Sequence, residues 1–506
     1  MNFKTYLPIH FEPGYKSWSV IDDTIFVSPA KHKININDID FQQPGNNASE
    51  IMWFYSLGWL AKYSESEKVE AQVLKFLSNY FKEVSSGNLD IIYKISSLDH
   101  CAASRIRYLC MIYARFHENQ EITNIVRLLL IREVEWFSSL TGVACNNHGM
   151  MLCVSIFHAA LVIGKGGILC ELETAMLWLK GILDTVIPEN GYVVENTIGY
   201  HDFYFKYIKN QLVFFDEYYH DLEVYDYLNG LFNKVELALY KVVMPNGNIP
   251  PLGQCGFYPT RYKSIPGTHL FKDQGFFVKK DNIDYFSLTC GYASPVHKQL
   301  DNTSITLSLS GNEIFIDSGL GTYNEKDSRS AVLNGQRGHS GAFFKALDNE
   351  YRHLFLSSNE LKNVMSSIDI DGCSILSSFS FDFKQYKYSI ERDINFINFK
   401  SFSIFDKFET NNDYGFPVSR FILPKDTSIT INSNVISIDC ENHLVSMTIG
   451  SSFNYSFKTG SDDFDKTEFA SGWRSLSFGK FEKCNVIELY PINGNELSIM
   501  IDIKDK

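Results

Sequence analysis

Apolar residues recur at helical spacing through the first half of the chain. Positions such as Val69, Val73 and Phe76 repeat every three or four residues, which is typical of a helix with one buried face. Breaks that contain glycine or proline, for example at Gly164 and Pro188, are typical of helix ends. The pattern therefore predicts a series of consecutive helices.

Apolar and polar residues alternate instead in the second half. Ile305, Leu307 and Leu309 alternate with polar residues, which is the period of a half-buried strand. The polar turn at 310–312 leads into a second apolar run at 313–316, and two strands joined by such a turn form a hairpin. The alternation recurs toward the end of the chain, so the second half is predicted to be mainly antiparallel β.

The change from the helical to the strand pattern falls near residues 250 to 270. Each half must bury its own apolar face, so we expect two domains. We predict an irregular, proline-containing N-terminal lead-in over residues 1–48, a helical domain over 49–262 and a β domain over 263–506. Clefts between such domains are common ligand sites.

Composition narrows the classes of partner. A chain of 506 residues is too long for one ordinary core, and its net charge of -13 argues against a protein that coats nucleic acid or an anionic membrane. No run of about 18 apolar residues is present to span a membrane. The 40 Phe and 28 Tyr residues suit either large sandwich cores or sugar-stacking clefts.

The cysteines and the N-terminal residues bear on location. The ten cysteines include no CxxC pair and no metal-ligand spacing, which is typical of reduced, mostly buried thiols. The first residues lack a basic region followed by an apolar one, so no secretory signal is predicted. We expect a cytoplasmic protein, or a periplasmic or secreted one if a leader has been removed.

Polar groups able to do chemistry gather at helix boundaries in the first half. Asn146, Asn147 and His148 precede an apolar helix, where Asn147 or His148 either caps the helix or donates hydrogen bonds into a cleft. The segment 195–201 opens an aromatic-rich helix, in which Tyr200 is either a core ring or a functional group. Asp99 and His100 start another helix, whose residues Arg105 and Arg107 are expected to form a solvated basic face.

A further polar group surrounds the predicted hairpin. His297, Lys298, Gln299 and Asp301 precede it, and Asp317 follows it before a glycine-rich turn. Considered alone, these residues are equally typical of an ordinary loop, with a loop histidine and aspartates that form turns. Later in the chain, His339 follows an arginine in a loop.

The order of these motifs resembles that of the heparinase II/III-like polysaccharide lyases. The resemblance covers roughly residues 53–344, and after about residue 350 only the strand-rich character agrees. It implies an incomplete α/α toroid followed by an antiparallel β-sandwich, with an active site in the groove between them. The segments that carry it are Asp99–Arg105, Asn146–Gly149, Glu195–His201, His297–Asp301, Ile316–Tyr323 and His339.

The resemblance implies β-elimination at a uronic acid, in which the C5 proton is removed and the O4 glycosidic oxygen leaves. Asn147 and His148 resemble the donors that neutralise the substrate carboxylate, an electrostatic contribution that is commonly large. Tyr200 resembles the proton-transfer tyrosine, and His297 resembles the histidine of the β domain that assists it. A tyrosine needs nearby positive charge to act as a base near neutral pH, and Arg105 and Arg107 are candidates to supply it.

The resemblance also implies residues that bind substrate and, in many members, a metal. The expected substrate-binding residues are Arg105, Asn146, Glu195, His201, Gln299 and His339. Many members carry a second histidine where this chain has Gln299, and that histidine binds zinc together with a later aspartate and histidine. Asp317 and His339 remain here, but two strong ligands and an amide oxygen make a poor zinc site. We therefore expect no tightly held metal and no other cofactor.

These observations predict a polysaccharide lyase whose partner is an acidic, uronate-containing polysaccharide or oligosaccharide, either glycosaminoglycan-like or from a bacterial capsule. No nucleic acid and no membrane is expected as a partner. One alternative is a catalytically inactive glycan-binding protein of the same fold. The other is a glycoside hydrolase, which needs two carboxylic acids at the scissile bond; Glu195 with Asp301 or Asp317 would have to supply them.

Overall fold

The computed structural model divides the chain into two compact units. The first comprises residues 1–186 and 210–226, and the second comprises residues 187–209 and 227–506. Most of the predicted lead-in and Tyr323 lie outside the described residues. The described residues are 18–21, 23–27, 32–42, 44–45, 48–94, 98–220, 222–294, 297–321, 328–345, 361–383, 385–412, 415–460, 471–477, 479–492 and 494–506.

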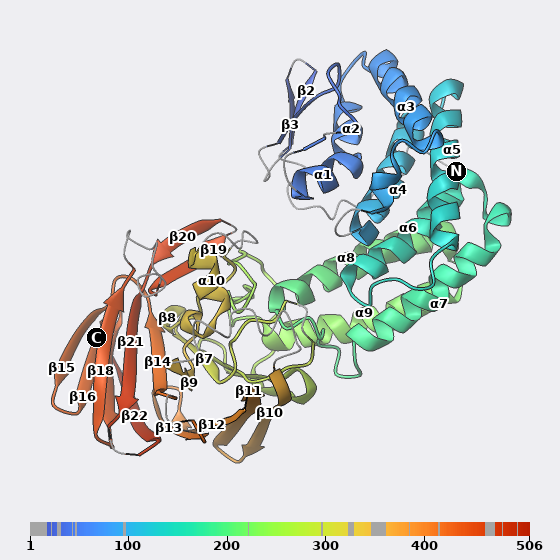
Figure 1. The fold of residues 1–506 in the computed structure, drawn as a ribbon. Helices are drawn as coiled ribbons and strands as arrows, with labels where there is room; N and C mark the ends of the chain where they lie inside the picture. Colours follow the sequence, from blue (N-terminus) through green and yellow to red (C-terminus); the bar gives the residue numbers. More distant parts are fainter. Residues whose placement is uncertain are drawn as a thin grey trace. The chain divides into compact units, whose positions relative to one another are not determined.

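The first unit consists of helices that follow one another in the chain, preceded by a small antiparallel sheet of order β1-β2-β3 (Figure 1). Its sheet strands are β1 (Ser19–Ile21), β2 (Thr24–Val27) and β3 (His32–Asn35). Its helices are α1 (Ala48–Tyr55), α2 (Gly58–Tyr63), α3 (Glu70–Ser85), α4 (Leu98–Arg115), α5 (Gln120–Ser138), α6 (Asn147–Ile163) and α7 (Leu169–Val186), and the second half of α8 (Ile198–Tyr219) also belongs to it.

Helix α6 is the centre of this unit. It packs against α4, α5 and α7, and nearly all of its side chains are buried. A helix that is apolar on every side must be surrounded by other helices, which explains why α6 lacks the one-sided pattern of α3 and α5. The sequence thus specifies one buried helix with amphipathic helices around it.

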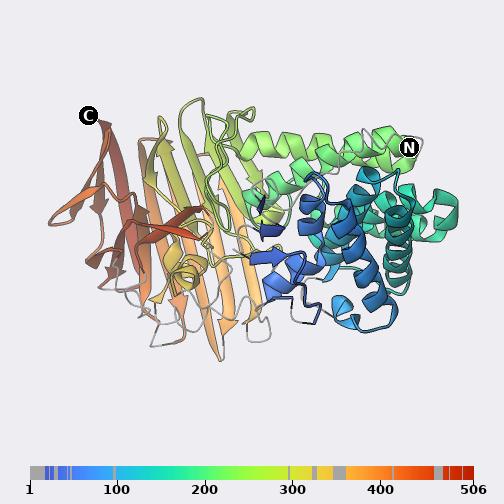
Figure 2. The same ribbon diagram turned by 90° about the horizontal axis from the view of Figure 1, so that it is seen from above.

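The second unit contains the first part of α8, most of α9 (Glu223–Val242) and the strand-rich region, whose layered strands are visible in Figure 2. A five-stranded sheet has the order β4-β5-β6-β7-β8, an eight-stranded sheet the order β10-β11-β12-β13-β22-β17-β16-β15, and a four-stranded sheet the order β18-β21-β14-β9. The strands β19 and β20 form a separate hairpin. The named strands of this region pair antiparallel within the described residues.

The bounds of the strands and short helices in the second unit are as follows. They are β4 (Gly267–Phe271), β5 (Phe276–Lys280), β6 (Tyr285–Thr289), β7 (Ser304–Leu309), β8 (Asn312–Phe315), α10 (Ser328–Asn334), β9 (Ala342–Phe344), β10 (Leu361–Asp371), β11 (Ser374–Phe383), β12 (Tyr386–Asn398), β13 (Ser401–Thr410), β14 (Pro417–Leu423), β15 (Ser428–Asn432), β16 (Val435–Cys440), β17 (His443–Ile449), β18 (Phe453–Thr459), β19 (Trp473–Ser477), β20 (Lys480–Lys483), β21 (Asn485–Pro491) and β22 (Glu496–Asp505).

Aromatic residues join these sheets into one core. Phe286 of β6 packs edge to face against Phe396 of β12, with ring centroids 4.9 Å apart. The ring centroids of Phe315 of β8 and Phe421 of β14 are 5.2 Å apart. Residues of the five-, eight- and four-stranded sheets belong to a single buried cluster. Part of the high phenylalanine content therefore fills the core of a β-sandwich.

The change from helices to strands lies between Val242 at the end of α9 and Gly267 at the start of β4. The compact units divide differently, because residues 187–209 and 227–262 group with the sheets. One contact shows why: the buried Lys280 of β5 donates to the Tyr240 and Val243 carbonyls at the end of α9, at 2.9 and 2.6 Å. The buried amine there donates to carbonyls that a helix end leaves without partners.

The predicted hairpin is present as β7 and β8. Leu309 pairs with Asn312, and the two residues between them, Ser310 and Gly311, both have positive φ. Such a two-residue turn matches the twist of paired strands. Among the described residues, no helix combines the length and apolar character needed to cross a bilayer.

Candidate active site

The start of α6 carries the first group of predicted site residues. Asn146 is the N-cap, with extended backbone and a side chain that accepts from the His148 backbone N–H at 2.9 Å. The cap is therefore neither Asn147 nor His148, and both lie in the first turn of the helix. Gly149 is needed for close approach, because a Cβ there would lie 2.0 Å from the Ala144 carbonyl oxygen.

His148 stacks on His100 of α4, with ring centroids 5.1 Å apart. Burial lowers the pKa of His148, although the nearby Asp99 acts in the opposite direction. Burial, and then repulsion from His148, lowers the pKa of His100 to about 3. Both imidazoles are thus neutral near pH 7, and His148 presents a neutral hydrogen-bonding group at this helix start.

Arg105 does not lie where the sequence places it. Its side chain is 0 % exposed, and Nε and Nη2 donate to the two carboxylate oxygens of Glu133 in α5, both at 2.7 Å. Arg107 is buried as well, so the predicted solvated basic face is wrong. Glu133 lies 28 positions from Arg105, and nothing local in the sequence reveals that pairing.

The second unit contains Tyr200, in the first turn of α8, and His297, in the loop before β7. Their rings stack with centroids 3.5 Å apart and planes inclined by 17°. Nδ1 of His297 lies 3.0 Å from Oε1 of Gln254. Both rings are partly exposed, with 20 % of the His297 side chain accessible, so a ligand is able to reach this pair.

Glu195 lies behind that pair. It is 1 % exposed, Oε1 accepts from the Tyr204 hydroxyl at 2.6 Å, and Oε2 lies 3.7 Å from Nε2 of His297. Asn196 joins the two loops, because its side-chain amide donates to the Ser294 carbonyl at 2.7 Å. Asn196 and His297 both have positive φ, and strained backbone of this kind gathers at functional sites.

His201 has a structural role in this unit. It is fully buried, Nδ1 accepts from the Val193 N–H at 3.3 Å, and Nε2 donates to the Val235 carbonyl at 3.0 Å. Burial lowers its pKa to about 4, with the Val235 hydrogen bond opposing that effect. His201 is therefore neutral and joins α9 to the loop before α8, out of contact with solvent.

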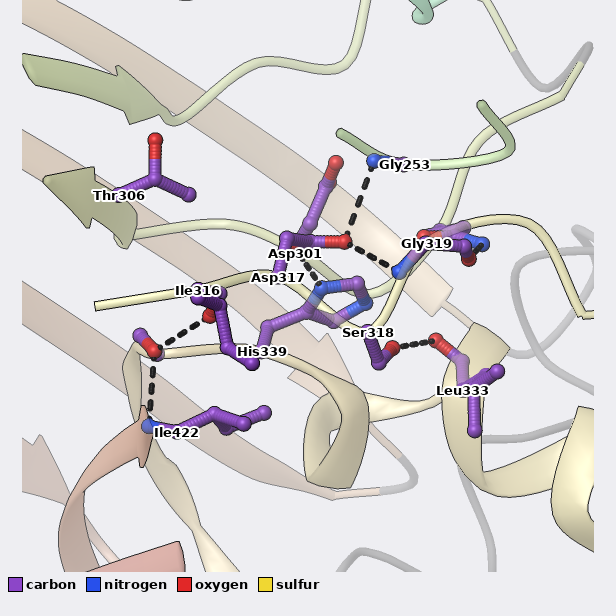
Figure 3. A network of polar contacts seen from close by, with 12 residues as sticks. Gly253, Asp301, Thr306, Ile316, Asp317, Ser318, Gly319, Leu333, His339 and Ile422 are labelled. Atoms are coloured by element: carbon purple, nitrogen blue, oxygen red, sulfur yellow. Dashed lines mark hydrogen bonds and ion pairs between the residues drawn. The ribbon is translucent and has the colours of Figure 1, made fainter. Parts of the chain in front are cut away.

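Asp317 and His339 form a buried pair close to Gly253 (Figure 3). Nδ1 of His339 donates to Oδ2 of Asp317 at 2.7 Å, and Oδ1 of Asp317 accepts from the Gly253 and Gly319 N–H groups at 3.3 and 3.0 Å. Gln299 is buried, and its amide nitrogen donates to the Gly319 carbonyl and to Asn334. These contacts hold the segment after β8 in place.

The same residues occupy the position at which the resemblance implies zinc, and they do not fit that ion. Nε2 of His339 and Oε1 of Gln299 are buried, have no hydrogen-bond partner among the described residues and are able to bind a metal. Both oxygens of Asp317, however, already accept hydrogen bonds. No third imidazole, thiolate or carboxylate completes the set in the described part of the chain. Structural zinc needs four strong ligands.

The predicted substrate-binding residues are mostly not exposed to solvent. Asn146 is a helix cap, and the structure buries Arg105, Glu195, His201, Gln299 and His339. His148 at the start of α6 and the Tyr200–His297 pair are the predicted groups that a ligand can reach.

Sequence reasoning missed three contributors. Tyr204, one helical turn after Tyr200, had a detectable signal in its spacing, whereas Gln254 had none. The third is the hairpin β19–β20: Ser475 exchanges backbone hydrogen bonds with Ser318 and Leu320 at 2.8 and 3.1 Å, and Leu476 accepts from Phe257 at 2.8 Å. This hairpin braces both the segment after Asp317 and the segment that carries Gln254.

Residues 266–496 match the family model described as "Heparinase II/III-like, C-terminal". This part of the chain is a heparinase II/III-like domain. It holds His297, Gln299, Asp317 and His339 at the positions described above. The predicted resemblance to this family is thereby confirmed.

Solved structures extend the likeness in fold to both units. A mutant of heparan sulfate lyase HepC from Pedobacter heparinus matches with a TM-score of 0.65 and 12% identity, over 100% of this chain and 86% of that one. A heparinase III with methylated lysines matches with a TM-score of 0.65 and 13% identity, over the same shares. No curated protein matches by sequence. The predicted fold class, an incomplete α/α toroid followed by an antiparallel β-sandwich, is confirmed.

Proposed function

We propose that this protein is a polysaccharide lyase that cleaves an acidic, uronate-containing polysaccharide by β-elimination. The observation that carries the proposal is the Tyr200–His297 pair, stacked at 3.5 Å and partly exposed. A phenol next to an imidazole is suited to moving one proton at a sugar ring. The heparinase II/III-like domain and the fold support the same class of enzyme.

The reaction assigns a step to Tyr200 and to the residues that start α6, where His148 is partly exposed and Asn147 is buried. Tyr200, as phenolate, takes the C5 proton; the electron pair of that C–H bond forms the C4=C5 double bond, and the C4–O4 bond breaks. The phenol then returns the proton to the leaving O4 oxygen, so no water is consumed. Asn147 and His148 are proposed to donate hydrogen bonds to the uronate carboxylate, which stabilises the charge that develops as C5 loses its proton.

The proposed substrate is glycosaminoglycan-like or a bacterial capsule polymer, and the proposed reaction needs no metal. The solved lyases of this fold include one whose substrate is heparan sulfate. The chain itself supports an acidic substrate through the donors at the start of α6. Heparan sulfate is therefore the first polymer to test.

The carboxylates argue against a hydrolase. Glu195 is buried against Tyr204, Asp301 is buried in an ion pair with Lys298, and Asp317 is bonded to His339. A glycosidase needs two carboxyl groups that face the scissile bond. All three carboxylates are instead committed to partners within the protein.

The test is the ultraviolet absorbance of unsaturated uronate during incubation with heparan sulfate, chondroitin, hyaluronan, alginate and capsule polymers. We expect a rise with at least one polymer that Tyr200→Phe abolishes. Tyr455→Phe, which alters an exposed tyrosine of β18, is the matched control and should retain the rise. New reducing ends without unsaturated uronate would show a hydrolase, and binding without cleavage would show a glycan-binding protein; either result would overturn the proposal.

A further inference from the structure

A buried carboxylate faces the imidazole that stacks on Tyr200. Glu195 is almost fully buried, accepts from the Tyr204 hydroxyl at 2.6 Å and places Oε2 3.7 Å from Nε2 of His297. At 3.7 Å this contact is too long for a hydrogen bond, and it is an ion pair only when the His297 ring is protonated. A buried ionised carboxylate is costly unless an opposite charge lies close to it, so this position favours a positively charged neighbour.

Both ring nitrogens of His297 face protein groups. Nδ1 is 3.0 Å from Oε1 of Gln254, an oxygen that only accepts, so Nδ1 carries a proton. A neutral ring would then point the lone pair of Nε2 at the Glu195 carboxylate, whereas a second proton turns that contact into an ion pair. The arrangement therefore favours the imidazolium form of His297.

The backbone maintains this geometry. His297 has a φ of 54° and Asn196 a φ of 57°, a region that side chains other than glycine rarely occupy. The Asn196 side chain bonds the Ser294 carbonyl at 2.7 Å, which joins the Glu195 loop to the His297 loop. Backbone conformations of this kind persist where the surrounding structure stabilises them, and they cluster at functional sites.

Other charged groups of the second unit near His297 are already compensated. The next residue, Lys298, is buried in an ion pair with Asp301. Tyr204 contributes a neutral hydroxyl to Glu195. The carboxylate of Glu195 thus acts on the His297 ring without competition from these neighbours.

We propose that Glu195 is a positioning residue that holds His297 as an imidazolium against the face of Tyr200. His297 then acts as a fixed cation that stabilises the Tyr200 phenolate, and it does not itself carry the proton to or from the sugar. A cation against an aromatic ring is attracted by the ring and more strongly by a phenolate. The catalytic consequence rests on the proposed lyase function, but the charge state of His297 does not.

This role provides the positive charge near Tyr200 for which the sequence offers arginine as a candidate. A tyrosine that acts as a base requires nearby positive charge, and Arg105 is bound to Glu133 inside the first unit. The stacked His297 supplies a charge at 3.5 Å from the Tyr200 ring centroid. His297, in the loop before β7, supplies the charge, and Glu195 maintains it.

The decisive experiment is nitrogen NMR of the full-length protein with labelled histidine, at pH 7, where the His297 signals are identified by their loss in His297→Gln. We expect both ring nitrogens of His297 to appear in the protonated range in the wild type. Glu195→Gln, which keeps the shape but removes the charge, should move one nitrogen to the unprotonated range. Tyr204→Phe, which removes a hydrogen bond but not the charge, should leave the ring protonated.

A neutral His297 in the wild type, or one that stays protonated in Glu195→Gln, would overturn the inference. If Glu195→Gln does not fold, the wild-type spectrum still decides the first point. Glu195→Ala, which also removes the charge, then replaces it for the second, with one ring nitrogen of His297 expected to move to the unprotonated range. These outcomes do not depend on turnover, so an inactive protein would refute the proposed function and leave this test intact.

Turnover gives the second readout once a substrate is found. Removing charge stabilisation at the reacting group should lower kcat roughly 100-fold in Glu195→Gln, with KM little changed because Glu195 is buried away from the substrate. Glu195→Asp should recover part of the loss. A change confined to KM would instead show that Glu195 contacts the substrate and would overturn the positioning role.

Discussion

His339 donates from Nδ1 to Oδ2 of Asp317 at 2.7 Å, in the place where the resemblance implies a metal. This hydrogen bond links the two segments directly. We therefore predict that a strong chelator leaves both the melting temperature and the activity unchanged. A loss of either that zinc restores would show that the protein does hold a metal.

The converse substitution gives a positive test of the same idea. Gln299→His would supply a third strong ligand beside His339 and Asp317, and a ligand that binds only the folded state raises stability. We expect added zinc to raise the melting temperature of Gln299→His but not that of the wild type. Equal responses in the two proteins would mean that Gln299 does not determine metal binding.

At the start of α6, neighbouring residues have different roles: Asn146 caps the helix, and Asn147 is proposed to contact substrate. Asn147→Asp has nearly the same shape but would repel a carboxylate, so kcat/KM should fall roughly 100-fold. The control is Asn146→Ser, which keeps an N-cap side chain and should keep activity. Asn146→Ala should lower stability by about 1 kcal/mol, measured by urea unfolding. Unchanged kinetics in Asn147→Asp would remove Asn147 from the substrate site.

Arg105 and Glu133 should behave as a buried ion pair. Arg105→Met leaves the Glu133 carboxylate buried without its partner and should cost about 3 to 5 kcal/mol of unfolding free energy. Adding Glu133→Leu removes the stranded charge and should restore much of that loss, measured by denaturant unfolding of the single and double variants. If Arg105 instead bound substrate, the double variant would fold well but show a raised KM.

His201 should make stability depend on pH. Burial lowers its folded pKa to about 4, whereas an unfolded histidine titrates near about 6.5. The unfolded chain therefore binds a proton first as the pH falls, so the contribution is complete above about 6.5 and is lost progressively down to about 4, at up to about 1.4 kcal/mol per pH unit. His201→Gln should flatten this part of the stability profile; an identical slope in both proteins would contradict the prediction.

The sequence predicts well those elements that depend on neighbouring residues alone. The spacing of apolar residues indicates the helices before Val242, and alternation with a polar turn indicates the hairpin of β7 and β8, because each pattern is complete within a few residues. The order of motifs locates Tyr200 and His297, which the structure stacks against each other.

What the sequence does not predict depends on distant partners. Arg105 reads as a basic surface residue because Glu133 lies on another helix. Glu195 reads as a substrate contact, yet it is buried behind His297, which is about 100 residues away along the chain. Gln254 contributes a single side-chain contact, and the β19–β20 hairpin contributes a few backbone hydrogen bonds. Contacts of these kinds leave no recognisable motif in the sequence.

The place of β22 in its sheet has a consequence for how the chain is made and handled. β22 lies between β13 and β17, so a cut before residue 496 would split the eight-stranded sheet into two parts, each with a newly open edge. Open edges of flat, apolar strands recruit strands from other molecules. Shortened products of incomplete synthesis or proteolysis would thus be prone to aggregate, and affinity tags are better placed away from this strand.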